Sequence, residues 1–346
     1  MPICTSCTHP TPYLYTVYQS AYNLRLEQCT ACHAFADPYV EHDTLTLLLD
    51  LILLKRDVYR HLLFNRGLGA RKVGQGGRAD AGAETKEGYE EELRHINDWG
   101  REKTRRWLIV KLGLALISVD AFIRWTHLSA SNPFVGRGPD GSEVDLANWN
   151  RTAVEGFLRI FVGCLVETVA FHVGIVIGCF TVLNSLHWAR TLKLLRFRTD
   201  PQMSGIRQEF RYSHVPLTLL YSSLTKLLLL FLLSIWRPTA PSPANHAQAL
   251  HPNAKTFTHP VVVRALEILD EDKLDREWVV RNVLGGMSAG FGLRVVLDCP
   301  PVFTTLIILG GWVVKTAMAN LVKEWVGAGL GGDETAGEMW LAYSIP

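Results

Sequence analysis

The feature that most constrains this chain is the clustering of its apolar residues into blocks of about 20 residues, separated by polar segments. A helix of that length crosses the roughly 30 Å hydrocarbon core of a bilayer, and soluble cores rarely contain several such blocks. The blocks are Trp107–Trp125, Phe157–Leu183, Val215–Trp236 and Val302–Leu321. We therefore expect an α-helical multi-pass membrane domain over residues 107–322, with four spans favoured within a range of three to five.

Charged residues inside the blocks do not overturn this prediction. In the third block ten leucines, each contributing about −0.3 to −0.6 kcal/mol, outweigh Lys226 at roughly +3 kcal/mol on an insertion scale. The first block carries three charges, but Lys111 and Arg124 lie near its ends, where long side chains reach the interface. Asp120 stands four residues before Arg124, so the two can also pair along one helix face.

Four ionisable residues lie well inside the expected spans: Glu167, His172, Lys226 and Lys315. Such residues tend to face protein or a polar cavity, so they could line a path for a lipid headgroup. The more ordinary interpretation is that they make polar contacts between helices. Glu167 and His172 have no nucleophile or metal partner nearby in the sequence. We therefore expect no catalytic residue, no bound organic cofactor and no enzyme activity.

The remaining segments indicate linkers and loops. Residues 66–106 combine glycines with charged residues, so we expect a flexible charged linker, and they contain no phosphate-loop pattern. The expected loops are residues 126–156, 184–214 and 237–300, followed by a C-terminal tail at 323–346. Within the last loop, Val279–Leu297 is either a re-entrant or surface helix or, more simply, a helix of the loop.

Basic residues beside the blocks predict the orientation of the chain, because they favour the cytosolic side of a membrane. They are concentrated in residues 101–106, before the first block, and in residues 190–211, after the second. The loop 126–156 is acidic and suits the lumen. We therefore expect a cytosolic N-terminus, where thiols stay reduced. No signal-peptide pattern precedes Cys4, so membrane entry is expected to depend on internal spans.

The strongest chemical signal is a set of four cysteines near the N-terminus. Cys4 and Cys7 form one Cys-x-x-Cys pair, and Cys29 and Cys32 form a second pair after a gap of 21 residues. The two-residue spacer lets two thiolates converge on one ion, and two such knuckles complete the tetrahedron that structural zinc prefers. We expect these four residues to hold one structural zinc ion. A closed site has no open coordination position, so the metal would support folding and not catalysis.

The segment between the cysteine pairs predicts the fold of this module. Tyr13–Tyr18 is rich in aromatic and β-branched residues, and Asn23–Leu26 alternates polar with apolar ones. Together they indicate a hairpin beneath the knuckles, which is a zinc ribbon. Redox-active or disulfide-bonded cysteine pairs are the alternative. Cys164, Cys179 and Cys299 lie in or beside apolar stretches and are expected to be buried thiols.

A helix is expected after the ribbon. Asp43 is a suitable N-cap for a helix through Leu45–Leu54, which is apolar except at Asp50 and too short to cross a bilayer. The helix is expected to continue through Lys55–Asn65, where basic residues interleave with aromatic and apolar ones. It either lies in the membrane interface or packs on the ribbon as a buried helix. His61 is expected to be a packing or surface residue, not a ligand or a base.

Three segments of residues 1–65 occur in a recognisable order. Asn23–Leu26 precedes the second cysteine pair, Ala36–Glu41 follows it, and the block Tyr59–Asn65 ends the region. In these segments the chain resembles the Arv family of endoplasmic-reticulum lipid-homeostasis proteins, while the rest is similar only in having several spans with divergent loops. The resemblance implies residence in the endoplasmic reticulum membrane, with the Golgi membrane as a second location. It also implies roles in sterol trafficking, sphingolipid metabolism and glycosylphosphatidylinositol synthesis.

Two functional hypotheses follow. The first is a non-catalytic protein that moves membrane lipids, especially sterols, with the zinc ribbon supporting folding and partner contact. The alternative is an accessory subunit that scaffolds a membrane glycosyltransferase of glycosylphosphatidylinositol synthesis. Nucleic acid is not an expected partner, because the formal net charge is only +2 and the chain has no overall basic excess.

Overall fold

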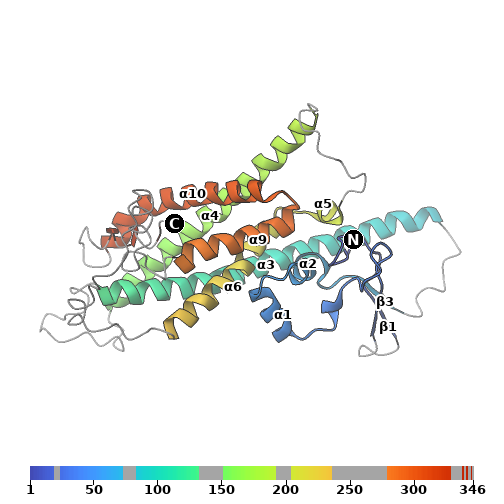
Figure 1. Cartoon of the computed structure of the whole chain (residues 1–346), viewed down its shortest axis with the longest axis horizontal. Coiled ribbons are helices and arrows are strands. Elements are labelled where there is room, and N and C mark those ends of the chain that lie inside the picture. Colours follow the sequence, from blue (N-terminus) through green and yellow to red (C-terminus); the bar gives the residue numbers. More distant parts are fainter. Residues whose placement is uncertain are drawn as a thin grey trace, which may run out of the picture.

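The computed structural model describes residues 1–18, 24–72, 83–131, 151–191, 204–235 and 279–328, together with Gly337, Glu338, Trp340, Leu341 and Ser344. A small N-terminal module lies beside one end of a set of helices that run along the long axis of the molecule (Figure 1). The helices of this bundle are α3 (Ala83–Ser131), α4 (Arg151–Thr191), α6 (His214–Ile235), α9 (Gly285–Leu297) and α10 (Pro301–Gly327). Shorter helical elements are η1 (Pro38–Val40), α5 (Gly205–Glu209) and the π-helical turn η4 (Val279–Leu284).

The N-terminal module contains a three-stranded sheet. β1 (Tyr15–Val17) and β2 (Leu24–Leu26) form the expected antiparallel hairpin, with Thr16 opposite Arg25. A third strand, β3 (Ala70–Lys72), pairs in parallel with the other side of β1, so the strand order is β2-β1-β3. We did not predict β3, because a three-residue strand has little signal of its own and its partner is far away in the sequence.

The helix after the ribbon begins where it was expected. α1 spans Thr44–Ile52, and the Asp43 carboxylate caps it by accepting the Thr46 backbone N–H at 3.2 Å. One face of α1 packs on α6, where the Thr225 hydroxyl donates to the Ile52 carbonyl at 2.9 Å. The opposite face is apolar and exposed at Leu45, Leu48, Leu49 and Leu53. An exposed leucine face is what a helix in the membrane interface would present to lipid.

The expected continuation of this helix to Asn65 is wrong. Leu54 has a left-handed φ of 56°, and a separate helix, α2 (Arg56–Arg60), follows and runs into the π-helical turn η2 (His61–Asn65). Lys55 stabilises the break, because its backbone N–H donates to the Asp50 carbonyl at 3.0 Å and its ammonium lies 2.7 Å from the Asp50 carboxylate. This ammonium, together with a hydrogen bond from Tyr39, lowers the pKa of Asp50 against the effect of burial.

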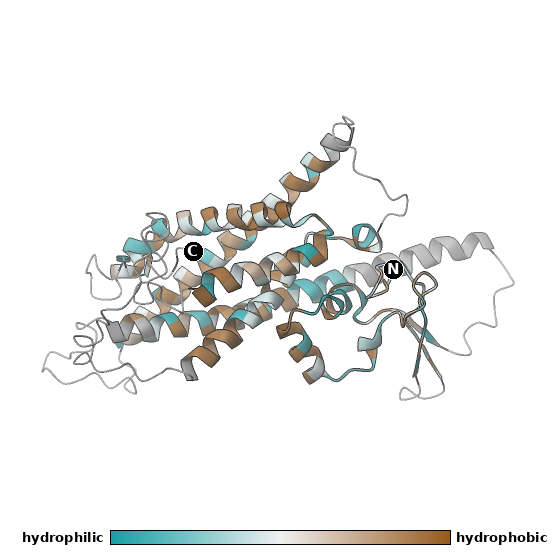
Figure 2. Cartoon of the chain, in the orientation of Figure 1, coloured by the Kyte–Doolittle hydropathy of each residue, from teal (hydrophilic) through white to brown (hydrophobic). Residues whose placement is uncertain are grey.

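Three helices in the described part of the chain have the length and apolar composition needed to cross a bilayer: Ala153–Leu186, His214–Leu233 and Pro301–Gly327. They correspond to the second, third and fourth expected spans, and most of their residues are hydrophobic (Figure 2). The first block lies in α3, which packs against α4 and α6 but carries three charged residues there. The favoured number of four spans is therefore not confirmed.

The expected linker is partly regular structure. Ala70–Lys72 is β3, and the helical backbone of α3 begins at Ala83, so residues 83–106 belong to one helix with the first apolar block. Glu, Lys and Arg are abundant in that stretch, and all three are good helix formers. Charge alone was therefore a poor indicator of a linker here. Residues 73–82 lie outside the described residues.

The expected loops are shorter than the sequence indicated. α3 extends to Ser131, α4 occupies residues 151–191, and α5 lies within the segment 184–214. Val279–Leu297 is a buried part of the bundle and not a loop helix, because η4 and α9 pack against α6 and α9 also packs against α10. The rest of the loop 237–300 before residue 279 lies outside the described residues.

The glycines that reduce the apolar content of α9 are the reason it can pack so closely. A Cβ atom at Gly292 would lie 2.7 Å from Cγ2 of Thr218 on α6. A Cβ atom at Gly286 would lie 2.5 Å from Cζ2 of Trp312 on α10. Small residues at such positions let helix backbones approach each other in membrane proteins.

The expected tail also folds back on the bundle. α10 continues to Gly327, and the Trp340 side chain is fully buried against residues of α3, α4 and α10. The Arg124 guanidinium lies over the Trp340 ring, 4.9 Å from its centroid. Ser344 also reaches the bundle, where its hydroxyl donates to Glu167 at 2.6 Å.

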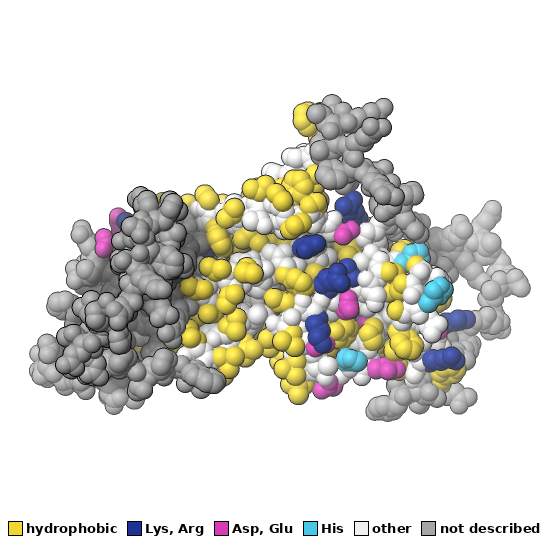
Figure 3. Space-filling model, in the orientation of Figure 1, with side chains coloured by type: hydrophobic (Ala, Val, Ile, Leu, Met, Phe, Trp, Pro, Cys, Tyr) yellow, Lys and Arg dark blue, Asp and Glu magenta, His cyan; other side chains and the backbone are white. Residues whose placement is uncertain are grey.

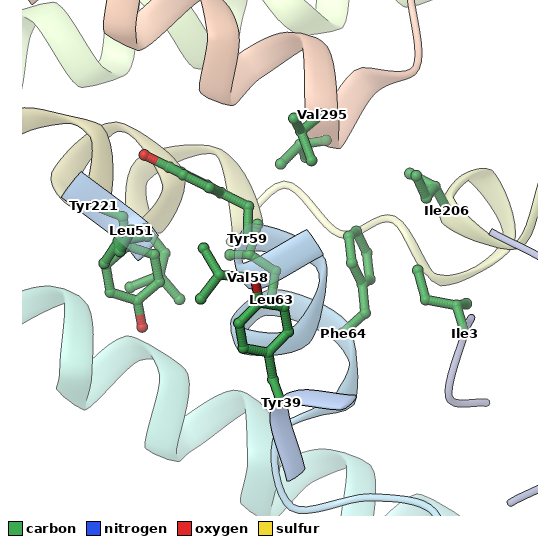
Figure 4. Packing of buried hydrophobic residues seen from close by; sticks show 12 residues of the cluster. Ile3, Tyr39, Leu51, Val58, Tyr59, Leu63, Phe64, Ile206, Tyr221 and Val295 are labelled. Atoms are coloured by element: carbon green, nitrogen blue, oxygen red, sulfur yellow. The ribbon is translucent and has the colours of Figure 1, made fainter. Parts of the chain in front are cut away.

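One hydrophobic core joins the N-terminal module to the membrane helices (Figure 4). Its buried side chains come from the first cysteine knuckle, η1, α1, α2, η2, α5, α6 and α9: Ile3, Tyr39, Leu51, Val58, Tyr59, Leu63, Phe64, Ile206, Leu217, Tyr221, Val295 and Val296. Burying one large apolar side chain contributes roughly 1.5–3 kcal/mol. The module is therefore packed on the bundle and is not a separate tethered domain.

Glycines also allow close packing between α4 and α10, which run antiparallel to each other. Gly174 and Gly178 form a Gly-x-x-x-Gly pattern on α4, where added Cβ atoms would lie 3.1 Å from Val314 and 3.2 Å from Ile307. On α10, Gly311 faces Ile175 of α4, and an added Cβ atom would lie 2.7 Å from its Cγ1. The neighbouring Gly310 would meet no atom within 4 Å.

These adjacent glycines provide a matched test of the α4–α10 interface. Gly311→Val is expected to lower stability by about 1–3 kcal/mol, because its methyl groups would overpack against Ile175. Gly310→Val, one residue away in open space, is expected to change stability by less than about 0.5 kcal/mol. Thermal unfolding of the purified protein in detergent measures both. Equal losses at the two positions would contradict this interface.

Candidate functional site

The four N-terminal cysteines converge on one point. Their Sγ atoms all lie within 4.8 Å of one another. Two of these distances join the two knuckles, 3.7 Å between Cys4 and Cys32 and 3.6 Å between Cys7 and Cys29. Four sulfurs placed tetrahedrally at about 2.3 Å from zinc are separated by roughly 3.8 Å. The donor set and its spacing therefore fit a tetrahedral metal ion, and this cluster could bind one.

The two knuckles have the same backbone design. In the first, the Cys4 carbonyl accepts the Thr8 N–H at 3.0 Å, and in the second the Cys29 carbonyl accepts the His33 N–H at 2.9 Å. Thr8 and His33 occupy equivalent positions and both have left-handed φ angles, 65° and 60°. The turn geometry therefore explains His33 without a metal-binding role. Among the described residues neither His33 nor His9 joins the cluster.

The cysteines differ in their surroundings. Cys4 and Cys29 are buried, whereas Cys7 and Cys32 are exposed at the outer side of the cluster. Burial raises the pKa of the Cys4 thiol to about 12. At Cys29 burial also acts to raise the pKa, but backbone N–H groups of Cys32 and Ala31 help to lower it to about 7. All seven cysteines of the chain are thiols in the structure, and Cys164, Cys179 and Cys299 are buried as expected.

A buried carboxylate ties the ribbon to the helices that follow it. Asp37 is fully buried, and its Oδ2 atom lies 2.7 Å from Nδ1 of His61 and accepts Nδ2 of Asn65 at 2.8 Å. Its Oδ1 atom accepts the backbone N–H of Tyr39 at 3.1 Å, which caps η1. His61 is thus a packing residue, as expected. Its partner is the carboxylate of Asp37, which follows the second knuckle in the sequence.

Two further side chains of α2 and η2 hold the first knuckle. Asn65 bonds the backbone of Ile3 twice, accepting its N–H at 2.9 Å and donating to its carbonyl at 2.8 Å. Arg60 donates from Nη1 to the carbonyls of Thr5 and Ser6. The polar residues of the block Tyr59–Asn65 therefore hold the backbone of the first knuckle in place.

The apolar residues of the same block face the membrane bundle. The Tyr59 ring packs edge-on against Phe291 of α9, with centroids 6.0 Å apart, and Phe64 packs against His214 of α6 at 4.8 Å. A second attachment comes from α5, whose Gly205 N–H donates to the Thr8 carbonyl at 3.1 Å. Charged and histidine side chains gather on the visible face around this module, and hydrophobic ones cover the adjoining bundle (Figure 3).

A second candidate site lies between the helices of the bundle. It is a cavity of about 140 Å³ lined by residues of α3, α4, α6, η4, α9 and α10. The four ionisable residues singled out in the expected spans, Glu167, His172, Lys226 and Lys315, all line it. Three residues that we did not connect with them, Asp120, Arg124 and Arg281, line it as well. The sequence signal that could have identified these residues is a charged residue within an apolar segment, which by default indicates a functional position.

The cavity has an ordered polar wall. Arg124 contacts Asp120 one turn away on α3 at 3.1 Å, as expected, and Glu167 on α4 at 3.1 Å. His172 bonds the Thr168 carbonyl through Nδ1 at 2.7 Å, while its Nε2 atom and Oδ1 of Asp120 make no hydrogen bond to a described residue. Glu167 thus makes an interhelical contact, as in the more ordinary interpretation, and it also faces a cavity.

The cysteine cluster predicts a metal stoichiometry. We expect the purified full-length protein to contain one zinc ion per chain, because four thiolates at this spacing complete a tetrahedral site. Cys29→Ser should lose the metal and make the module sensitive to protease, since structural zinc contributes about 10–16 kcal/mol in zinc-finger peptides. Cys179→Ser removes a buried thiol elsewhere and should keep the metal. Protein that contains no metal, and in which the cysteines between Cys4 and Cys32 are oxidised, would contradict this site.

The Asp37 network predicts a loss of stability. Asp37→Asn places an amide donor beside His61 and Asn65, and is expected to cost about 2–3 kcal/mol because a buried donor is left unpaired. Asp57→Asn, at a half-exposed position of α2, should cost less than about 1 kcal/mol. Thermal unfolding at constant zinc concentration compares the two variants. A loss at Asp57 as large as that at Asp37 would refute the role assigned to the buried carboxylate.

Comparison with known proteins agrees with this architecture. "Protein arv1" of Schizosaccharomyces pombe is 48% identical over 63 residues, which are 18% of this chain and 24% of that protein. "Protein ARV1" of Saccharomyces cerevisiae is 46% identical over 63 residues, 18% of this chain and 19% of that protein. "Protein ARV1" of Homo sapiens is 25% identical over 172 residues, 50% of this chain and 46% of that protein.

The match to the two fungal relatives thus spans about a quarter of their length or less. No solved structure matches the chain. The model of the Arv1-like family matches residues 3–253, which include the cysteine cluster, η2 and two of the three candidate spans. The chain is a membrane protein that belongs to the Arv1-like family.

Proposed function

We propose that this protein is a non-catalytic component of the endoplasmic reticulum membrane that moves lipids, chiefly sterols, and through them affects sphingolipid metabolism. The Golgi membrane is a second location in this proposal. The observation that carries it is the cavity among the spans, which lies within the bundle, has both charged and apolar residues in its lining and is large enough for the polar end of a lipid. Family membership supports the same role through the resemblance described above.

The N-terminal module has a supporting role in this proposal. The four thiolates bind one structural zinc ion, which has no open position and supplies no chemistry beyond folding. The module packs on α6 and α9, so the metal also stabilises the end of the bundle that we propose to be cytosolic. Its charged surface would contact partner proteins of complementary charge.

Sterol transfer between liposomes by the purified protein tests this function. We expect transfer well above the protein-free rate. Ala289 lines the cavity, so Ala289→Phe should fill it and reduce transfer several-fold, whereas Ala317→Phe on an exposed position of α10 should not. Size-exclusion profiles confirm that both variants are folded.

Two outcomes would contradict this proposal and support a different function. If the purified protein transfers no sterol but always co-purifies with a membrane glycosyltransferase of glycosylphosphatidylinositol synthesis, the protein is an accessory subunit. Turnover of a defined lipid by the pure protein would contradict both and indicate an enzyme.

A further inference from the structure

The described residues that line the intramembrane cavity carry more positive than negative charge. Arg281 makes a further interaction of its own and is left out of the balance. The others are three cations, Arg124, Lys226 and Lys315, against two carboxylates, Asp120 and Glu167. With His172 neutral, this leaves an excess of one positive charge. The imbalance is localised, because both carboxylates contact the same partner, Arg124, at 3.1 Å.

Two lysines line the same cavity as this arginine and its carboxylates, but come from other helices. Lys226 comes from α6 and Lys315 from α10, and both line the cavity. Among the residues that the structure describes, neither ammonium makes an ion pair or a hydrogen bond. At 1.5 Å per residue Lys226 lies about 18 Å along α6 and Lys315 about 21 Å along α10. Both are therefore near the middle of a hydrocarbon core about 30 Å thick.

This arrangement is costly unless the charge is compensated. A buried ammonium loses its hydration, and the loss is recovered only by a counter-charge at short range. Asp120 and Glu167 both contact Arg124, so these three groups together carry one net negative charge, which offsets only one of the two ammonium charges. The cavity has room for a counter-ion, since about 140 Å³ is roughly ten times the volume that one water molecule requires.

We propose that this cavity binds the phosphate group of a lipid headgroup, with Lys226 and Lys315 in direct contact with the phosphate oxygens. The charge excess and the depth of the two lysines carry the assignment of a phosphate. The assignment of a lipid as its source rests on the proposed function. Ammonium groups are strong donors to phosphate oxygens, and the remaining positive charge of the cavity attracts an anion.

Thermal unfolding of the purified full-length protein in a nonionic detergent tests this proposal. The probes are dioctanoyl phosphatidic acid, dioctanoylglycerol, which lacks the phosphate, and inorganic phosphate, all at equal ionic strength. We expect phosphatidic acid alone to raise the Tm in a concentration-dependent way. Equal shifts with dioctanoylglycerol would overturn phosphate recognition. An equal shift with inorganic phosphate would overturn a lipid as the source.

Substitutions locate the site. Lys226→Met and Lys315→Met are each expected to weaken the apparent affinity for phosphatidic acid roughly tenfold. Without ligand, both variants should be at least as stable as the unsubstituted protein, because an uncompensated charge has been removed. Lys111→Met, at an exposed position of α3 away from the cavity, should leave the affinity unchanged. Unchanged affinity in both cavity variants would contradict the proposal.

The same proteins separate this inference from the proposed function. Phosphatidic acid binding without any sterol transfer would overturn the transport role and leave the phosphate site standing. Sterol transfer without phosphatidic acid binding would overturn the phosphate site alone. If the methionine variants fail to fold, the comparison of phosphatidic acid with dioctanoylglycerol on the unsubstituted protein still decides.

Discussion

The structure of the N-terminal region depends on the buried carboxylate of Asp37. Its two oxygens accept hydrogen bonds from donors in η1 and η2. Asn65, one of these donors, also accepts a hydrogen bond from the backbone of the first knuckle. A buried charge of this kind is stable only when each of its oxygens is paired, so it specifies one arrangement of the surrounding segments. The hydrogen bonds of Asp37 therefore fix the positions of the knuckles, η1 and η2 relative to one another.

The block Tyr59–Asn65 has two opposite faces, and each has a separate task. Arg60, His61 and Asn65 hold the knuckles and Asp37, while Tyr59 and Phe64 pack on α9 and α6. A substitution on either face would separate the metal ligands from the membrane helices. This explains in physical terms why so short a block can be the most recognisable part of the region: almost every side chain has a buried partner.

The bundle has a comparable centre in Arg124. It contacts carboxylates from two helices and the hydroxyl of Ser344, and it lies over the ring of Trp340. In a bilayer such a group must find its partners within the protein, which ties α3, α4 and the C-terminal residues to one another. Glycines on α4, α9 and α10 permit the close approach that this network requires.

The sequence alone determined those features that depend on local spacing and local composition. The convergence of Cys4, Cys7, Cys29 and Cys32 follows from two short spacers, the β1–β2 hairpin from alternation, and three spans from the length of their apolar runs. Each of these signals lies within a few turns of chain. The pair of Asp120 and Arg124 was accessible for the same reason, since the two are one helical turn apart.

Only the tertiary structure decided which of these elements meet. The parallel pairing of β3 with β1, the burial of α9 and the return of Trp340 to the bundle each join segments that are distant in the sequence. The same is true of the cavity, where Glu167, Lys226, Arg281 and Lys315 come from different elements. Periodicity shows which face of a helix is polar, but not which other helix that face will contact, because the choice depends on long-range packing.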